Sequence, residues 1–330
     1  MAKIKDIAEK SGFSISTVSR VLNNDSNLSV PDETREKIFE VAERLNYRKK
    51  TVRPRVKNMA FLYWLTDKEE LEDVYFKTMR LELEKMAQDF NVELTTYKIT
   101  EGIERIPDSI EGFIAVGTFS NMELDYLKGI TLNGVFIDST PDPNHYDSVR
   151  PDLAQITSNT VDFLMAQGHT EIGFIGGTYH NPNTDSDEMD IRERTFRAYM
   201  KEKGLLNDDY IFWHRGFSVA NGYNLMKKAV HQLGDDLPSA FFIAADPIAV
   251  GCLQALNESG IAIPNRVSVI SINNISVAKY VSPPLTTYHI DLREICKNAV
   301  ELLVEQVLEK RKVVKTIYIG AELVIRKSTK

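Results

Sequence analysis

The sequence of 330 residues has few cysteines and no long apolar run. Its two cysteines, Cys252 and Cys296, provide neither a disulfide framework nor a set of metal ligands, and we expect both in the core. No apolar run approaches the length of a membrane span, and charges interrupt the N-terminus at once, so no signal peptide is predicted. These absences favour a cytoplasmic protein with no membrane contact.

Catalytic motifs are equally scarce. The six histidines are scattered, and no Ser-His-Asp arrangement, Walker loop or pair of acids stands out. A Gly-rich stretch at residues 173–177 follows an apolar run, but its spacing is not the Gly-x-Gly-x-x-Gly of a nucleotide loop. We therefore expect neither an enzyme nor a bound cofactor, and a nucleotide-dependent enzyme remains as a rival hypothesis.

Charge is divided unevenly along the chain. Through Lys57 there are 13 Lys and Arg against 8 Asp and Glu, a net charge of +5, whereas the whole chain carries −7. Residues 58–330 must therefore carry −12. A basic head on an acidic body is expected when only the head touches nucleic acid. The length itself predicts two or three domains.

The first 57 residues have the pattern of three short helices. Ile4, Ile7 and Ala8 form an apolar stripe on the first, Gly12 supplies a tight turn, and Ser14 is a candidate N-cap for the second. A third helix follows, with apolar residues at i, i+3, i+4 and i+7. Two helices joined by a Gly-containing turn predict a helix-turn-helix.

The second of these helices has two different sides. One is apolar and the other polar, with Ile15, Val18, Val21 and Leu22 on the first and Ser16, Ser19, Arg20 and Asn23 on the second. In the major groove an Arg can address guanine O6 and N7, while hydroxyls and amides contact phosphates or other base edges. An ordinary amphipathic surface helix is the alternative, but the neighbouring helices and the basic charge favour a recognition helix.

These motifs resemble the DNA-binding head of the lactose and galactose repressor family. The resemblance lies in Ile4-Lys5-Asp6-Ile7-Ala8, Gly12-Phe13-Ser14, Ser16 through Asn23, and Thr34-Arg35 through Leu45-Asn46-Tyr47. It implies that Ile15, Ser16 and Arg20 read bases of double-stranded operator DNA, bound by a homodimer. The predicted DNA-contacting residues are Ser14, Ile15, Ser16, Thr17, Ser19, Arg20, Asn23, Arg53 and Arg55.

A basic connector, residues 46–58, follows the head. It has no acidic residue, which a solvated linker would also explain. In the resembled family this region is a hinge helix that orders on DNA and wedges a Leu into the minor groove. Here Arg55 stands where that Leu is expected, and Pro54 would interrupt a helix. We therefore predict a basic arm along the DNA, not an intercalating wedge.

From Met59 the chain alternates strand-like and helix-like segments. The predicted strands are 59–65, 92–99, 112–119, 134–138, 171–177, 211–216, 239–245, 267–272, 286–290 and 316–325. The predicted helices are 74–90, 151–167, 190–203, 219–233, 247–259 and 291–310. This order favours two doubly wound, parallel-sheet subdomains, at roughly 59–150 plus 282–312 and 151–281 plus 313–330.

Ligands of such sheets bind at the carboxyl ends of the strands. That rule selects Tyr63, Phe119, Asp138, a Gly176-Gly177 turn, Phe217, Asp246 and the Asn273-Asn274 pair. Tyr75 and Phe76 open a helix after the first strand, where they would either wall a cleft or pack in the core.

The body resembles the effector domain of the same repressor family, which has the periplasmic sugar-binding fold. The markers are Gly168-His169 before Ile172 through Gly177, Ala244 through Gly251, Val267 through Asn274, Pro283-Pro284-Leu285-Thr286-Thr287 and Leu323 through Ser328. Arg192 matches the family's main ligand donor, and its planar fork would hold two vicinal hydroxyls. The predicted effector-binding residues are Arg192, Asn273, Phe217, Asp246, Asp138, Tyr75, Phe76 and Tyr63.

The resemblance therefore predicts a repressor of a galactoside utilisation operon that a galactose-containing sugar releases from DNA. Ala245 replaces a common Asn and Thr195 a common Gly, so the effector can differ from the best-known inducers. Two alternatives remain open. The same architecture can use a purine or protein corepressor that tightens DNA binding, and a sugar-processing enzyme would need a catalytic constellation not seen here.

Overall fold

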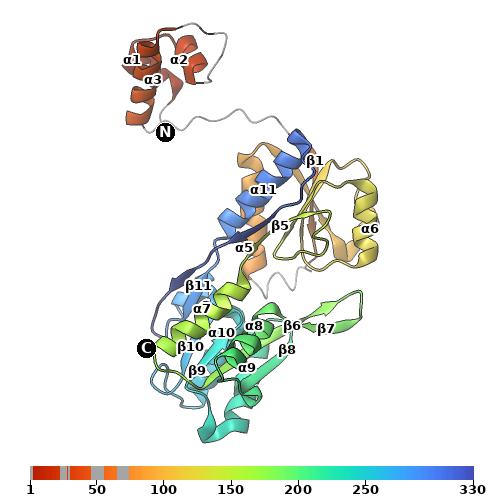
Figure 1. The fold of residues 1–330 in the computed structure, drawn as a ribbon, viewed down its shortest axis with the longest axis vertical. Coiled ribbons are helices and arrows are strands. Elements are labelled where there is room, and N and C mark those ends of the chain that lie inside the picture. Colours follow the sequence, from red (N-terminus) through yellow and green to blue (C-terminus); the bar gives the residue numbers. More distant parts are fainter. Residues whose placement is uncertain (1–2, 23–27, 29, 46–55, 65–73) are drawn as a thin grey trace. The chain divides into compact units, whose positions relative to one another are not determined.

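In a computed structural model the protein is described at residues 3–22, 28, 30–45, 56–64 and 74–330. The chain divides into two compact units, Met1–Pro54 and Arg55–Lys330, which we call the head and the body (Figure 1). Three predicted DNA-contacting residues, Asn23, Arg53 and Arg55, lie outside the described residues, as does most of the predicted connector.

The head contains the three predicted helices, α1 (Ile4–Ser11), α2 (Ile15–Leu22) and α3 (Asp32–Arg44). They enclose a small apolar core in which Ile7, Val18 and Ile38 have no exposed surface. Gly12 ends α1 in the left-handed region, with φ of 80°, a conformation that costs glycine little. The predicted helix-turn-helix head is confirmed.

The body contains two sheets. The first has the order β12-β5-β4-β3-β1-β2, and all of its strand pairs are parallel: β1 (Val56–Tyr63), β2 (Val92–Lys98), β3 (Gly112–Val116), β4 (Gly134–Ile137), β5 (Asp147–Pro151) and β12 (Thr316–Ile319). The second has the order β13-β11-β10-β9-β6-β7, with β8 also on β6: β6 (Ile172–Asn181), β7 (Ser186–Met189), β8 (Ile211–Arg215), β9 (Ala240–Ile243), β10 (Ser268–Asn273), β11 (Thr286–His289) and β13 (Glu322–Val324). We call each sheet with its helices a subdomain.

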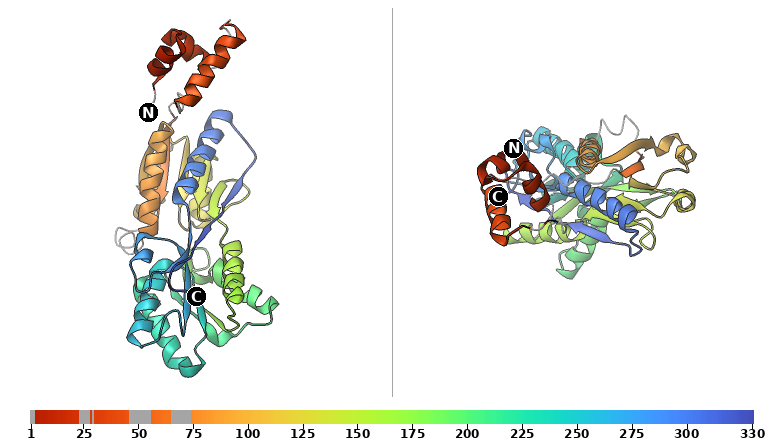
Figure 2. Two further views of the ribbon diagram at one scale, coloured as in Figure 1. Left: turned by 90° about the vertical axis from the view of Figure 1, so that its left-hand side faces the viewer. Right: turned by 90° about the horizontal axis from the view of Figure 1, so that it is seen from above.

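Helices cover both faces of each sheet. In the first subdomain α5 (Val74–Asp89) and α11 (Leu292–Glu309) lie side by side on one face, and α6 (Asn121–Ile130) covers the other (Figure 2). In the second subdomain α7 (Leu153–Ala166) and α8 (Ile191–Glu202) cover one face, and α9 (Val219–Leu233) and α10 (Asp246–Glu258) the other. Short 3-10 helices lie at Ile99–Glu101, Ile103–Arg105, Asp208–Tyr210 (η3), Gly234–Asp236 and Ser276–Lys279. The predicted two-sheet α/β architecture is confirmed.

The chain passes between the subdomains at other points than predicted. Strand β11 pairs with β10 in the second sheet, although its residues were assigned to the first subdomain. Residues 316–325, predicted as one strand, form two: β12 pairs with β5 in the first sheet and β13 with β11 in the second. A single apolar run can cross between two sheets, and hydrophobic pattern alone does not reveal the crossing.

One α-helix and two strands were not predicted. Strand β5 contains Asp147, which is fully buried and bonded to Arg311, so a polar residue stands where a buried strand is expected to be apolar. Strand β7 is largely exposed and polar, and α6 was missed as well. In addition β1 begins at Val56, inside the range predicted as connector, because Val56 is buried against Val92 of β2. No helix of the described ranges is long and apolar enough to span a bilayer.

Candidate DNA interface and effector site

Helix α2 presents the residues that were predicted to read bases. Ser16 and Arg20 are exposed, and Ser19 is half-buried. Ile15 is 53 % exposed, although the helical pattern placed it on the buried side. As the first residue of α2 it lies outside the core cluster that holds Val18. An exposed aliphatic side chain beside polar ones suits contact with a thymine methyl group.

Two of the residues predicted to contact DNA, Ser14 and Thr17, form hydrogen bonds with each other inside the head. The Ser14 hydroxyl accepts a hydrogen bond from the Thr17 amide at 3.0 Å and shares another with the Thr17 hydroxyl at 2.8 Å. Ser14 is therefore the N-cap that the sequence predicted. The pair fixes where α2 starts, and with it the direction of the exposed side chains.

In the body, Arg192 is the centre of a group of polar contacts. Asp190, the N-cap of α8, accepts hydrogen bonds from Arg192 Nε at 2.7 Å and Nη2 at 2.9 Å, while Nη1 donates to the Ala244 carbonyl at 2.7 Å. The side chain is only 11 % exposed. A guanidinium has five N–H donors, so two remain for a ligand once these three bonds are made.

Charge balance keeps this arginine ionised despite its burial. Burial alone would lower the pKa of Arg192, but Asp190 opposes it and raises the pKa overall, with smaller contributions from Tyr75 and Asp138. Burial would likewise raise the pKa of Asp190, and Arg192 holds it below its ordinary value. Tyr75 and Asp138 of the first subdomain are therefore close enough to Arg192 of the second to affect its pKa.

Phe217 lies against the guanidinium, with its ring centre 4.8 Å from Arg192 Cζ. The approach depends on Gly177, where an added Cβ would lie 2.5 Å from the Gly216 carbonyl oxygen. Gly176 and Gly177 are not the predicted turn, because both lie inside β6, which continues to Asn181. The glycines give close packing instead of a chain reversal.

The first subdomain contributes a second polar pair. Tyr75 donates a hydrogen bond from its hydroxyl to Asp138 Oδ2 at 2.9 Å, and Asp138 follows β4 with φ of 63°. Phe76 is half-buried and meets the Tyr75 ring edge to face at 5.2 Å. Tyr63 is 2 % exposed, at the end of β1. Phe119, also chosen by the strand-end rule, lies in the core.

Asp246 has a different place from the predicted one. It has no exposed surface, and its carboxylate accepts hydrogen bonds from the hydroxyls of Ser271 and Thr287, both at 2.7 Å, and from the Ile275 amide at 2.8 Å. All three donors belong to the protein. Asp246 therefore joins β10 to β11 through Ser271 and Thr287, and its carboxylate is bonded within the protein.

Beside it, Asn273 and Asn274 are both left-handed, with φ of 117° and 55°. Arg326 holds Asn274 by donating from Nη2 to Oδ1 at 2.6 Å. Within the described part of the chain the Asn273 side chain has no hydrogen-bond partner, which leaves its amide for a ligand. The structure thus separates a supporting residue, Asn274, from the one predicted to bind.

Burial of Asp246 predicts a pH effect on stability. Burial raises its pKa from 3.8 to about 6, while its three donors work in the opposite direction. The native state therefore keeps the proton that the unfolded chain loses near pH 4, and the stability contributed is complete below that pH and lost as the pH rises through 6. Relative to Asp246→Asn, the wild-type free energy of unfolding should fall by about 2 to 3 kcal/mol between pH 4 and 7.

Urea unfolding of both proteins across this range measures the difference, and the other titrating groups cancel because both chains carry them. A difference that does not change with pH would contradict the burial argument.

Sequence reasoning missed two residues in this part of the second subdomain. Asp190 was recognised only as part of a motif, although an Asp at a helix start two residues before an Arg is a typical capping signal. Thr178 is 5 % exposed, and its hydroxyl has no partner among the described residues. It follows Gly177 directly, but it was hidden because the strand was predicted to end there.

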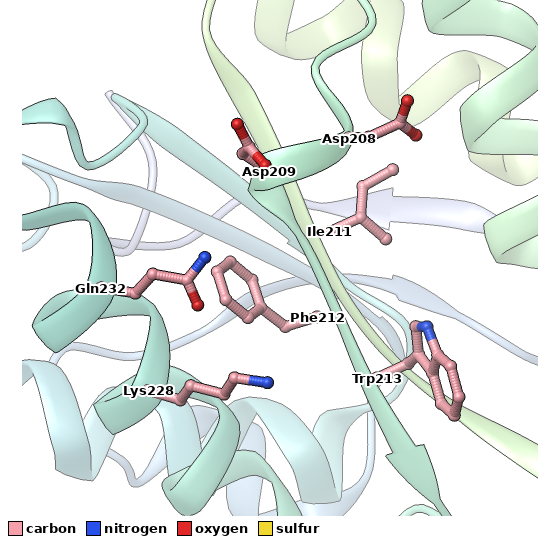
Figure 3. A pocket seen from close by; sticks show the side chains of 7 residues that line it. All are labelled: Asp208, Asp209, Ile211, Phe212, Trp213, Lys228 and Gln232. Carbon is pink, nitrogen blue, oxygen red and sulfur yellow. The ribbon is translucent and has the colours of Figure 1, made fainter.

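A pocket of about 350 Å³ lies away from this group, against η3, β8 and α9 (Figure 3). Phe212 and Trp213 point to opposite sides of β8, as neighbours on a strand do, and Asp208 in its wall is already paired with Arg197. It shares no residue with the surroundings of Arg192. We therefore base the effector proposal on Arg192 and the residues that contact it.

The two parts of the chain match known families. Residues 3–50 match bacterial regulatory proteins of the lacI family, and residues 161–329 match the periplasmic binding protein-like domain. The HTH-type transcriptional regulator GanR of Bacillus subtilis (strain 168) is 74% identical over 328 residues, which cover 99% of each chain. The chain belongs to the LacI family.

Other transcriptional regulators are similar to this chain over nearly its full length. The HTH-type transcriptional regulator LacR of Lactobacillus helveticus is 37% identical over 99% of this chain and 98% of its own. The lac repressor dimer bound to operator and the anti-inducer ONPF has the same fold, with a TM-score of 0.71 at 20% identity and 99% of both chains covered. The regulator CelR in complex with cellobiose gives 0.69 at 19% identity, over 99% and 100%.

This LacI-family protein is a DNA-binding, sugar-responsive transcriptional repressor, and the enzymatic hypotheses are not favoured.

Proposed function

We propose that this cytoplasmic repressor binds a pseudo-palindromic operator as a homodimer and is released by a galactose-containing sugar held at Arg192. Ile15, Ser16 and Arg20 read the bases. The observation that carries the sugar site is the buried Arg192 guanidinium, which keeps two N–H donors after its bonds to Asp190 and Ala244.

The chemistry around Arg192 suits a pyranose. The remaining N–H donors, one on Nη1 and one on Nη2, can bond to sugar hydroxyls, and the Phe217 ring offers an apolar surface to the C–H face of a sugar. Asp138 and Asn273 add acceptor and donor groups that can distinguish one hydroxyl from another. Thr178 joins this set because a buried hydroxyl without a partner is costly unless a ligand satisfies it. The galactose assignment rests on the resemblance to regulators of galactoside operons.

The two subdomains explain how a sugar changes DNA affinity. Arg192 belongs to the second subdomain, and Asp138, in its electrostatic field, belongs to the first. A ligand that bonds to both favours one arrangement of the subdomains over another. If that arrangement holds the two heads of a dimer out of register with the operator half-sites, sugar and DNA weaken each other's binding by the same factor.

A ligand screen on the full chain tests the proposal. We expect galactose or lactose, but not glucose, guanine or hypoxanthine, to raise the thermal midpoint, because a ligand at 100 times its Kd stabilises the native state by about 2.7 kcal/mol. The same sugar should weaken operator binding in a titration. A purine that raises the midpoint and tightens operator binding would support the corepressor hypothesis and overturn this one.

A further inference from the structure

A two-stranded hairpin joins the effector site to the other subdomain. Strands β6 and β7 pair antiparallel from Thr178 opposite Met189 to Asn181 opposite Ser186. Strand β6 pairs with β9 only as far as Ile175 and with β8 only as far as Thr178. Beyond that point, within the described strands, β7 is its only partner. We call residues 178–189 the strap, which projects from the sheet beside α8 in Figure 1.

An isolated two-stranded hairpin is marginally stable, so the strap needs other contacts. The Asn181 side chain supplies two. Its Oδ1 accepts a hydrogen bond from the Asn183 amide at 2.8 Å, and its Nδ2 donates to Glu188 on the opposite strand. The Tyr179 hydroxyl also donates to Glu188, at 3.3 Å. These bonds set the conformation of the tip and the position of Asn183.

The tip of the strap contacts the first subdomain. The backbone N–H of Asn121 donates a hydrogen bond to Asn183 Oδ1 at 2.6 Å. Asn121 is the first residue of α6, and its N–H belongs to the opening turn, which has no partner within the helix. Ser120 and Glu123 satisfy each other in a capping box and leave this donor to Asn183. A side chain of the second subdomain thus completes the cap of a helix in the first.

The base of the strap adjoins the residues that hold Arg192. Met189 directly precedes Asp190, whose carboxylate binds the guanidinium. On the other strand the Thr178 carbonyl accepts a hydrogen bond from the Gly216 amide at 3.0 Å, one residue before Phe217. Motion that separates α6 from the second subdomain must therefore break the Asn183–Asn121 bond or pull on both sides of the effector site.

We infer that the strap ties the Arg192 site to α6, and that Asn183 is a positioning residue. Its bond to Asn121 stabilises the arrangement of the two subdomains in which Asp138 lies near Arg192, which is the arrangement that the sugar would bind under the function proposed above. The strap then lowers the sugar concentration at which the repressor leaves its operator. The response it adjusts is the one proposed above, so this inference rests on that proposal, whereas the bond itself is measurable without sugar.

Three variants of the full chain separate the strap from its surroundings. Asn183→Ala removes the acceptor, and Asn183→Asp keeps it and adds negative charge where a helix N-terminus favours it. Thr184→Ala removes only a hydroxyl contact within the tip, to Ser186 at 2.8 Å. Amide hydrogen exchange at Asn121 without sugar and the lactose concentration that releases half of the operator are measured for each.

Asn183→Ala should speed exchange at Asn121 about two- to fivefold and raise the half-release concentration by about the same factor, as expected for one exposed hydrogen bond. In Asn183→Asp and Thr184→Ala, the exchange rate at Asn121 and the half-release concentration should be no higher than in wild type. Unchanged exchange in Asn183→Ala, or faster exchange with an unchanged half-release concentration, overturns the inference. If lactose does not release the wild-type chain from its operator, the sugar assignment fails. The exchange rate at Asn121 in Asn183→Ala still decides whether the strap bond exists.

Discussion

Replacing Arg192 by alanine is expected to leave operator binding intact and to abolish release by sugar. The change removes the two N–H donors assigned to sugar hydroxyls, and each bond from a charged donor contributes about 1.5 to 3 kcal/mol. Losing both should raise the sugar concentration for half-release by at least about 100-fold. The residue lies in the body, so the head should bind operator as in wild type.

The variant needs a control because it also leaves a buried carboxylate. Asp190 is 6 % exposed, and an unpaired buried charge costs about 3 to 5 kcal/mol. The double variant Asp190→Asn with Arg192→Ala removes that charge, so it should recover stability in urea unfolding without recovering the sugar response. Operator release at wild-type sugar concentrations by either variant would remove Arg192 from the effector site.

The head was predictable because its signals are local. Spacing of the apolar residues, a glycine between helices and a serine cap each act within a few residues, and Gly12 and Ser14 take the roles they indicate. Ile15 was placed wrongly by pattern because burial depends on how far the core extends. Its position became clear only from the packing of α2 against α1 and α3.

The fold class of the body was predictable from the sequence, but the way the chain connects the two sheets was not. Alternating strands and helices indicate parallel sheets, but which sheet a strand joins depends on partners far along the chain. Asp147 illustrates the limit, because Arg311 and the Lys315 amide make its burial acceptable. No property of residues 147–151 alone reveals that pairing.

The strand-end rule selected residues whose contacts in the structure differ. It selected Asp138, which is bonded to Tyr75, Phe217, which lies against Arg192, and Asn273, whose side chain has no hydrogen-bond partner among the described residues, and their contact with a ligand stays a prediction. It also selected Asp246, which lies at a strand end yet spends its carboxylate on Ser271, Thr287 and Ile275. The sequence shows that a polar residue follows a strand. Only the three-dimensional contacts show whether its side chain already has hydrogen-bond partners within the protein.

Arg20→Ala is expected to weaken specific operator binding by about 1 to 3 kcal/mol, roughly 5- to 150-fold, because a bidentate contact to guanine O6 and N7 is lost. Binding to random DNA should change much less, since phosphate contacts supply that affinity. Arg44→Ala is a matched control: Arg44 is also an exposed head arginine, bonded to Glu40 at 2.7 Å on α3. Both variants lose one positive charge, and only Arg20 lies on α2.

Titration of operator and random DNA at several salt concentrations distinguishes the two roles of Arg20. A base contact should lower operator affinity with little change in the salt slope, whereas loss of a phosphate contact reduces the slope by about one. Equal loss on operator and random DNA, or an equal effect of Arg44→Ala, would contradict base reading by Arg20. The exposed face of α2 would then serve to hold the head on the DNA backbone, and recognition would have to lie elsewhere in the chain.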